Sequence, residues 1–136
     1  MSTTAQYAST PKNSGAQIST ANTGRDGTGT LGTIYTAGAS GSRVDSIVIQ
    51  ATGTTTAGMI RFFSSIDAGT TKRLIGEVPV LANTPSATTP AWQVTLTSQN
   101  ASFMGNGLVL QASSILYAST NNAEAFNVIA VNAGDF

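Results

Sequence analysis

Two apolar runs, residues 44–51 and residues 59–66, stand on either side of a small polar segment, residues 52–58. Both runs are rich in β-branched and aromatic side chains, which suit the pleated surface of a half-buried β-strand. The segment between them reads TGTTTAG, and its two glycines disfavour any helix through this region. We therefore predict a β-hairpin here, with a loop longer than a two-residue turn.

Further short apolar or alternating segments are spaced regularly along the chain, with turn-forming residues between them. They lie at residues 31–37, 72–80, 91–98, 108–112, 115–119 and 124–132. Pro79 near the end of one segment predicts an edge position or an exit from the sheet, because proline has no N–H to donate to a neighbouring strand. About eight strands at this spacing predict an all-β sandwich, barrel or jelly roll.

Several of these strands carry large apolar side chains on both faces. Adjacent apolar residues occur at 47–49, 59–60, 62–63 and 108–110. A sandwich that stays monomeric usually keeps one face of each sheet polar. We therefore expect another subunit to cover the outer face of at least one sheet; the alternative is that loops or strand ends of the same chain cover it. Phe62 and Phe63 are the candidate contact residues, because adjacent side chains on a strand point to opposite faces.

The N-terminal residues 1–29 differ from the rest of the chain. They are rich in Ser, Thr, Asn, Gly and Ala, and Tyr7 and Ile18 are their large apolar side chains. A segment this polar buries too little apolar surface to fold alone. We predict an extended N-terminal arm over residues 1–29, with a short strand near 17–20, followed by a β-sandwich domain over residues 30–136. Plain disorder of the arm is the alternative. Tyr7 and Ile18 are the candidate anchors of this arm on a partner.

Charge is scarce along the whole chain. Only 9% of the 136 residues are charged, and six basic side chains balance six acidic ones. A neutral, charge-poor chain argues against nucleic-acid binding, which requires Lys and Arg to neutralise phosphates. The same composition suits surfaces that pack against neighbouring chains, where charges would have to be desolvated.

Targeting signals and disulfides are not expected. The chain contains no cysteine, and no apolar run approaches the roughly 18 residues of a membrane span. The first 15 residues lack the charged start and apolar centre of a signal peptide. We therefore expect folding in a cytosol, with no disulfides and no membrane association.

The usual chemistry of an active site is missing. Without histidine or cysteine, the chain has neither the commonest general base and metal ligand nor a thiolate nucleophile. Glu77 and Glu124 both lie in predicted strands and could in principle form a carboxylate pair, but pairing with an arginine or exposure to solvent is the simpler reading. The glycine-rich segment around Asp26 lacks the further acidic residues of a calcium loop. We predict a protein that is not an enzyme and binds no cofactor or metal.

Two aromatic residues leave a different function open. Trp92 and Tyr117 are side chains of the kind that stack on sugar rings, so a carbohydrate-binding module is an alternative. A single Trp in an alternating strand is more often part of the core.

Longer stretches of the chain resemble a known family. The run IYTAGASGSRVDSIVIQATGTTTAGMIRFF at residues 34–63, the EVPV strand at 77–80 and the ending YASTNNAEAFNVIAVNAGDF at 117–136 resemble small head-decoration proteins of tailed bacteriophages. The resemblance covers roughly residues 30–136, and none of its marks is a catalytic motif.

The resemblance implies a fold and a role. It implies a β-sandwich of jelly-roll type that decorates or cements a phage head. The partners would be the major capsid protein and further copies of the chain, commonly as a homotrimer. The location would be the capsid surface of a virion, and a structural component of the tail or fibre is the alternative within the same setting.

Overall fold

The computed structural model of the chain describes residues 8–136, and almost all of its regular structure is β-strand. Ten strands and one 3₁₀ helix follow in the order β1 (Thr10–Pro11), β2 (Ser14–Ile18), β3 (Gly32–Thr36), β4 (Ser42–Ala51), β5 (Gly58–Ser65), β6 (Arg73–Val80), β7 (Gln93–Leu96), η1 (Ser102–Met104), β8 (Leu108–Leu110), β9 (Ile115–Thr120) and β10 (Phe126–Asp135). Within residues 8–136, no helix is long and apolar enough to cross a membrane.

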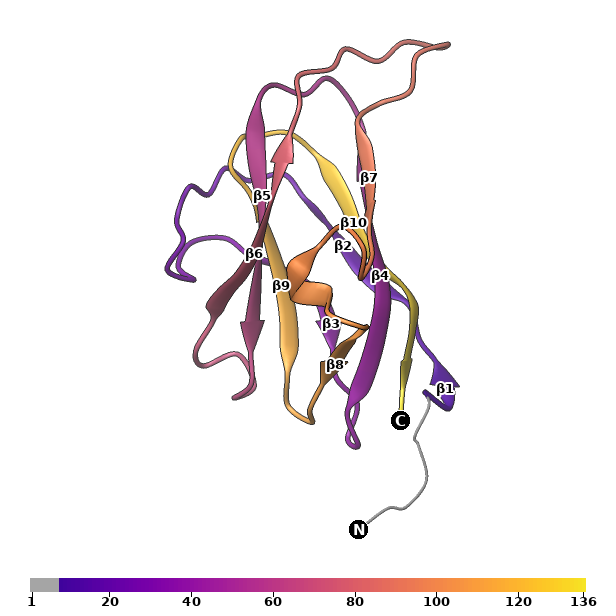
Figure 1. Cartoon of the computed structure of the whole chain (residues 1–136). Coiled ribbons are helices and arrows are strands. Elements are labelled where there is room, and N and C mark those ends of the chain that lie inside the picture. The colour runs from indigo at the N-terminus through magenta and orange to yellow at the C-terminus, as the bar shows by residue number, and fades with distance from the viewer. Residues whose placement is uncertain (1–7) are drawn as a thin grey trace.

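The strands form two antiparallel sheets that face each other (Figure 1). Sheet A has the order β1-β10-β4-β7, with β2 also paired to β10 and β8 also paired to β4. Sheet B has the order β3-β9-β5-β6. The all-β sandwich predicted from the strand pattern is confirmed.

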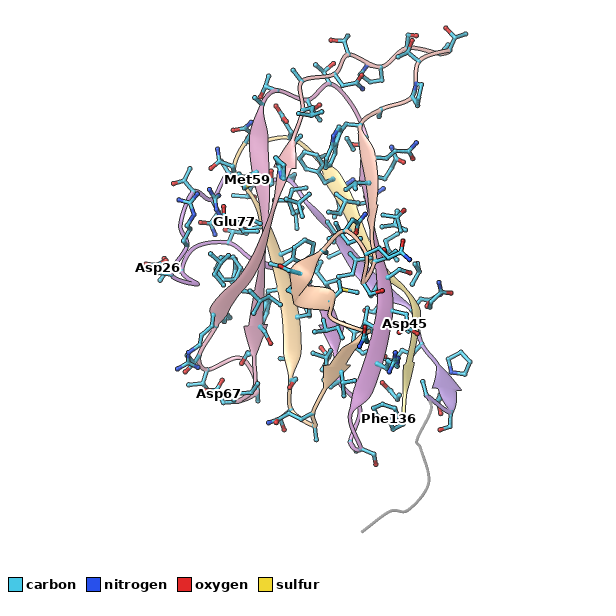
Figure 2. All side chains as sticks on the ribbon, in the orientation of Figure 1. Asp26, Asp45, Met59, Asp67, Glu77 and Phe136 are labelled. Atoms are coloured by element: carbon cyan, nitrogen blue, oxygen red, sulfur yellow. The ribbon has the colours of Figure 1, made fainter. Side chains whose placement is uncertain are left out.

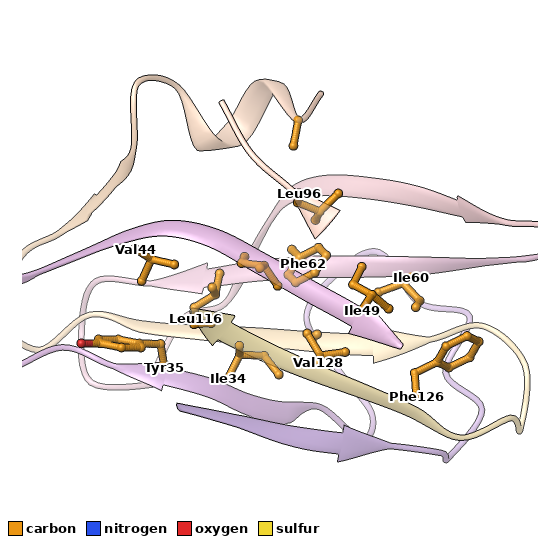
Figure 3. Packing of buried hydrophobic residues seen from close by; sticks show 14 of the residues in the cluster. Ile34, Tyr35, Val44, Ile49, Ile60, Phe62, Leu96, Leu116, Phe126 and Val128 are labelled. Carbon is orange, nitrogen blue, oxygen red and sulfur yellow. The ribbon is translucent and has the colours of Figure 1, made fainter. Parts of the chain in front are cut away.

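Apolar side chains from both sheets meet between the two layers (Figure 3). In β10, Phe126, Val128 and Ala130 are buried and alternate with residues of the outer face. Phe62 of β5 enters the same core from the opposite sheet and is fully buried. Each large apolar side chain buried in this way contributes roughly 1.5–3 kcal/mol to folding.

The strand pairs are nested along the chain. β2 pairs with β10, β3 with β9, β4 with β8 and β5 with β6, always antiparallel. The chain is therefore one long hairpin whose tip is the turn after β5. Rolling this hairpin up places β10 beside β4 and β9 beside β5, which closes the two sheets.

The predicted hairpin over residues 44–66 is wrong, although both of its strands exist. β4 belongs to sheet A and β5 to sheet B, so residues 52–57 cross from one sheet to the other. β4 takes its hydrogen bonds from β10, β7 and β8, all far away in sequence. Apolar side chains alone could not reveal this, because both strands bury residues in the same core. The edge position predicted from Pro79 is confirmed, since β6 ends sheet B.

The N-terminal region is not a free arm from residue 1 to residue 29. β2 pairs with β10 over five residues, and Ile18 is 6% exposed in the core. The boundary expected at residue 30 therefore cuts through the sandwich. The polar composition of this region suggested a free arm, but one buried Ile and backbone hydrogen bonds are enough to hold an edge strand. Tyr7 lies outside the described residues.

Candidate interaction surfaces

The two phenylalanines singled out as contact residues point to opposite faces of sheet B. Phe62 faces the core and packs on Phe103, with ring centroids 5.2 Å apart. Phe63 lies opposite Tyr117 in the sheet register, on the outer face. Both phenylalanines are 0% exposed. Neither presents a side chain to another subunit, and Ile18 is likewise buried within its own chain.

The outer face of sheet B is covered by the chain itself, through residues 19–31 that connect β2 to β3. This connection passes beside β5 and β6; Figure 2 labels Asp26 on the connection and Glu77 on β6. Arg25 donates to both carboxylate oxygens of Glu77, from Nε at 2.6 Å and from Nη2 at 3.2 Å. Asn22 N–H donates to the carbonyl of Thr120. Phe63 is buried although it is not part of the core between the sheets, and it lies on the same face of β5 as Arg61, which donates to the carbonyl of Asn22 in this connection. We name residues 19–31 the cover.

Close packing of the cover requires a glycine at position 27. Gly27 has a φ of +85°, and a Cβ added there would lie 2.5 Å from the carbonyl oxygen of Lys72. Glycine is the residue that adopts this conformation without steric cost. The cover and the turn before β6 are therefore in direct backbone contact.

A buried arginine lies under the cover. Arg61 is 4% exposed and donates from Nη1 to Asn121 Oδ1 at 3.1 Å, while its Nε is 4.0 Å from the Glu77 carboxylate. The hydrogen bond from Arg25, with the charges of Arg25 and Arg61, holds the pKa of Glu77 below its usual value. Burial explains why Arg61 needs this compensation, since an uncompensated buried charge is costly.

A second polar cluster joins the ends of four strands. Asp135 accepts hydrogen bonds from the Tyr35 hydroxyl at 2.9 Å and from Ser42 Oγ, and Lys12 Nζ lies 3.5 Å away. The Ser42 hydrogen bond is the main reason that the pKa of Asp135 is lowered. Burial, with help from Asp135, raises the pKa of Tyr35 to about 12. The cluster ties β1 to β3, β4 and β10, and its groups are already bonded to one another.

The sandwich is open along the side where β6 faces β7 and β8, and this side carries exposed apolar side chains. Ile66, Leu81 and Val109 are 58%, 66% and 59% exposed. A groove of 570 Å³ is lined by Ser64, Ile66, Ile75, Phe103, Leu108, Val109, Leu110, Gln111 and Ser114. None of these lining residues is ionisable. We name this groove, with the exposed Ile66 and Val109, the open side. Leu81 lines a separate groove together with Glu77.

The outer face of sheet A is also uncovered by the described chain. Its cross-strand neighbours form one row of amides and one row of mainly small or apolar residues. The amide row is Gln17, Asn127, Gln50 and Gln93, and the second row is Gly15, Ile129, Val48 and Thr95. Ile129 is 39% exposed and borders a shallow groove of 380 Å³ beside Gly15. We name these eight residues the amide face.

The two aromatic residues considered for sugar binding lie in different surroundings. Tyr117 is 9% exposed, and Lys72 Nζ lies 5.3 Å above its ring. Trp92 packs edge-on against Phe126 at 6.0 Å and lines a groove of 330 Å³ together with Gln93 and Asn100.

The carboxylates considered for catalysis or metal binding are held by separate parts of the chain. Glu77 binds Arg25, whereas Glu124 accepts hydrogen bonds from the N–H and hydroxyl of Thr56 at 2.9 and 2.6 Å. Asp26 accepts from the N–H and hydroxyl of Thr28 in its own turn. Among residues 8–136, no group of three acidic, His or Cys side chains could hold a metal ion.

Comparison of the chain with protein-family models, curated proteins and solved structures found no match.

The exposed apolar residues were missed by sequence reasoning, although some signals were present. Val109 lies in a strand whose two faces are both apolar, and Ile129 follows the same pattern in β10. Ile66 and Leu81 directly follow the ends of β5 and β6, where the strand pattern gives no information about exposure. A search for apolar residues just outside strands would have found both.

Proposed function

We propose that the chain is a structural protein of a phage particle, which binds the major capsid protein on the head surface and stabilises the head. The observation that carries the proposal is the open side, where two large apolar side chains, Ile66 and Val109, are exposed and line a groove without ionisable residues. Exposed apolar surface of this kind is typical of sites where another protein binds.

The strand order supports the same proposal. Four nested antiparallel pairs rolled into two sheets are the arrangement of a jelly roll, which we propose as the finer description of the sandwich. Jelly rolls are common among viral capsid proteins. The resemblance of residues 30–136 to head-decoration proteins points to the same class, and it adds a homotrimer as the expected oligomer.

The test uses heads that were assembled without the chain and then mixed with purified protein. We expect wild-type protein to sediment with the heads, and we expect the double variant Ile66→Asp with Val109→Asp to stay in the supernatant. A charge placed in an apolar contact must be desolvated, which weakens binding strongly. Ala87→Asp, in an exposed turn and not among the residues that line the open side, is the matched control and should bind like wild type.

Three outcomes would overturn parts of the proposal. Absence of wild-type protein from the heads would remove the decoration role. Density for the chain on the tail in a cryo-EM map would favour the tail or fibre alternative. Equal binding by the double variant would show that the open side is not the contact surface.

Carbohydrate binding remains a second candidate because Trp92 borders a groove together with two amide side chains. Trp92 is the only tryptophan in the chain, so its fluorescence reports directly on that groove. Titration with soluble glycans should leave the emission unchanged if the proposed head-binding role is the whole function. A saturable change that a Gln93→Ala variant weakens would support the sugar-binding alternative.

A further inference from the structure

Asn106 is exposed and is followed by Gly107 in the turn that connects η1 to β8. It is the one asparagine of the chain that precedes a glycine. A backbone nitrogen can attack the side-chain amide of the asparagine before it, and a glycine, which has no Cβ, leaves that nitrogen unshielded. The pair Asn106 and Gly107 therefore has the covalent arrangement in which an asparagine loses its amide most readily.

The side chain of Asn106 is not held in place by the rest of the chain. Within residues 8–136, each of the other eight asparagines has its side-chain amide in a hydrogen bond, whereas the amide of Asn106 has none. Asn100 is exposed as well, but its amide donates to the carbonyl of Thr95 and accepts from the N–H of Thr97, both at 2.8 Å. Asn106 can thus turn towards the Gly107 nitrogen without breaking a side-chain hydrogen bond.

The fold requires a glycine at position 107. Gly107 has a φ of +113°, and a Cβ added there would lie 2.7 Å from Asp45 Oδ1 and in still closer contact with Arg43 Nη2. Arg43 Nη2 also donates to the carbonyl of Asn106 at 2.5 Å. A guanidinium donor withdraws electron density from this peptide group, which favours loss of the proton from the Gly107 nitrogen.

One hydrogen bond opposes the attack. The Gly107 N–H donates to the carbonyl of Met104 at 2.9 Å, and this bond must open before the nitrogen can react. It lies in a turn next to Gly105, which is exposed and has a φ of +53°. Exposed turns open locally at a small cost in free energy. The folded chain should therefore react more slowly than the unfolded chain, but it should react.

We propose that Asn106 is a site of spontaneous deamidation in the folded protein. The Gly107 nitrogen loses its proton and bonds to Cγ of Asn106, and the side-chain nitrogen leaves with one added proton as ammonia. Water then adds across one of the two C–N bonds of the succinimide ring. Opening at Cγ gives an aspartate, and opening at the backbone carbonyl gives an isoaspartate. No redox change takes place, and water is the only reagent.

The isoaspartate lengthens the main chain by one carbon immediately before β8. The added atom moves the Gly107 N–H away from the carbonyl of Met104 and disturbs the register in which Val109 lies opposite Arg43. Because β8 has only three residues, a disturbance at its start affects the whole of its pairing with β4. This inference goes beyond the proposed function and is measured without phage heads, so the failure of either leaves the other standing.

Peptide mapping by mass spectrometry measures the reaction in folded protein stored in warm, weakly alkaline buffer. The peptide with Asn106 should gain the mass difference between an amide and a carboxyl group several-fold faster than the peptide with Asn13, which precedes Ser14. Enzymatic methylation of isoaspartate should rise in parallel in wild type and stay at background in Asn106→Ser. Asn13→Ser is the matched control and should be methylated like wild type.

Urea unfolding of fresh and stored protein provides the second measurement. Stored wild-type protein should unfold at a lower urea concentration than fresh protein, whereas storage should not change Asn106→Ser. Loss of the Asn106 amide only in urea-unfolded chain, or no faster than at Asn13, would overturn the inference. An unchanged unfolding midpoint in fully modified protein would overturn its consequence for β8.

Discussion

The outer face of sheet B is buried by the chain itself, whereas the outer face of sheet A is not covered by the described chain. Sheet B carries Arg61, Phe63 and Tyr117 on its outer face, and all three are buried by the same chain. The cover bonds to this face through Arg25 and Asn22. Sheet A carries the amide face, which the described chain leaves open. The outer face of sheet B has large apolar groups and a buried charge, whereas the amide face has amides, small residues and isolated apolar side chains.

This difference shows how a strand with apolar residues on both faces should be interpreted. We expected another subunit to cover β5 because Phe62 and Phe63 point to opposite faces. The alternative, cover by the same chain, is what the structure contains. An apolar outer face can thus be buried within a single chain. Apolar side chains that stay partly exposed, such as Ile129, are better candidates for contact with a partner.

Loss of the N-terminal strands should have the largest effect. Deletion of residues 2–22 removes β1 and β2 with their pairing to β10 and the buried Ile18, and it removes the first four residues of the cover. The lost contacts together approach the 5–15 kcal/mol that typically stabilises a domain, so we expect an unfolded or aggregated protein. Circular dichroism and urea unfolding measure this. Deletion of residues 2–7, which keeps all ten strands, is the control and should retain the spectrum. A folded product of the longer deletion would mean that the N-terminal region is a separable arm after all.

Phe63→Ala should destabilise the isolated chain by about 3–5 kcal/mol, as expected for a fully buried aromatic side chain. Ile66→Ala is the apolar comparison, because Ile66 is 58% exposed and its truncation should cost less than about 1 kcal/mol. Urea unfolding of both variants gives the difference. Similar small values for the two variants would indicate that the cover over Phe63 does not persist in solution.

Glu77→Gln should reveal a pH dependence that belongs to the covered face. Arg25 lowers the pKa of Glu77 in the folded chain from its usual 4.5, so the stabilisation is complete above that value and is lost as the pH falls through the lower folded pKa. The stability gap between wild type and Glu77→Gln should therefore be present at pH 7 and disappear in acid. A gap that stays constant with pH would contradict the ion pair.

Gln17→Ala should have the smallest effect. Its amide hydrogen bond to Asn127 is exposed, and the variant should change the free energy of unfolding by less than about 0.5 kcal/mol. Unfolding measured at low protein concentration gives the free energy of unfolding of the single chain. A loss above 1 kcal/mol under those conditions would show that the amide row stabilises the sheet itself.

Much of the fold was visible in the sequence. The apolar segments coincide with β3 to β10, and Pro79 correctly indicated an edge strand. Pairing was not visible, as the wrong hairpin over residues 44–66 shows. β2 was largely missed because only Ile18 in it is large and apolar. The open side was missed because exposure at Ile66 and Val109 depends on what lies beside them in space.

The sequence by itself determined where strands form, because alternation and β-branched side chains act over a few neighbouring residues. It also determined which chemistry the chain lacks, since no fold can supply an imidazole or a thiol. The tertiary structure was needed to show which sheet each strand joins and which outer face of the sandwich is covered by the chain. Strand pairing and burial join residues far apart in the chain, such as Gln17 with Asn127 and Arg25 with Glu77, and local patterns do not specify those partners.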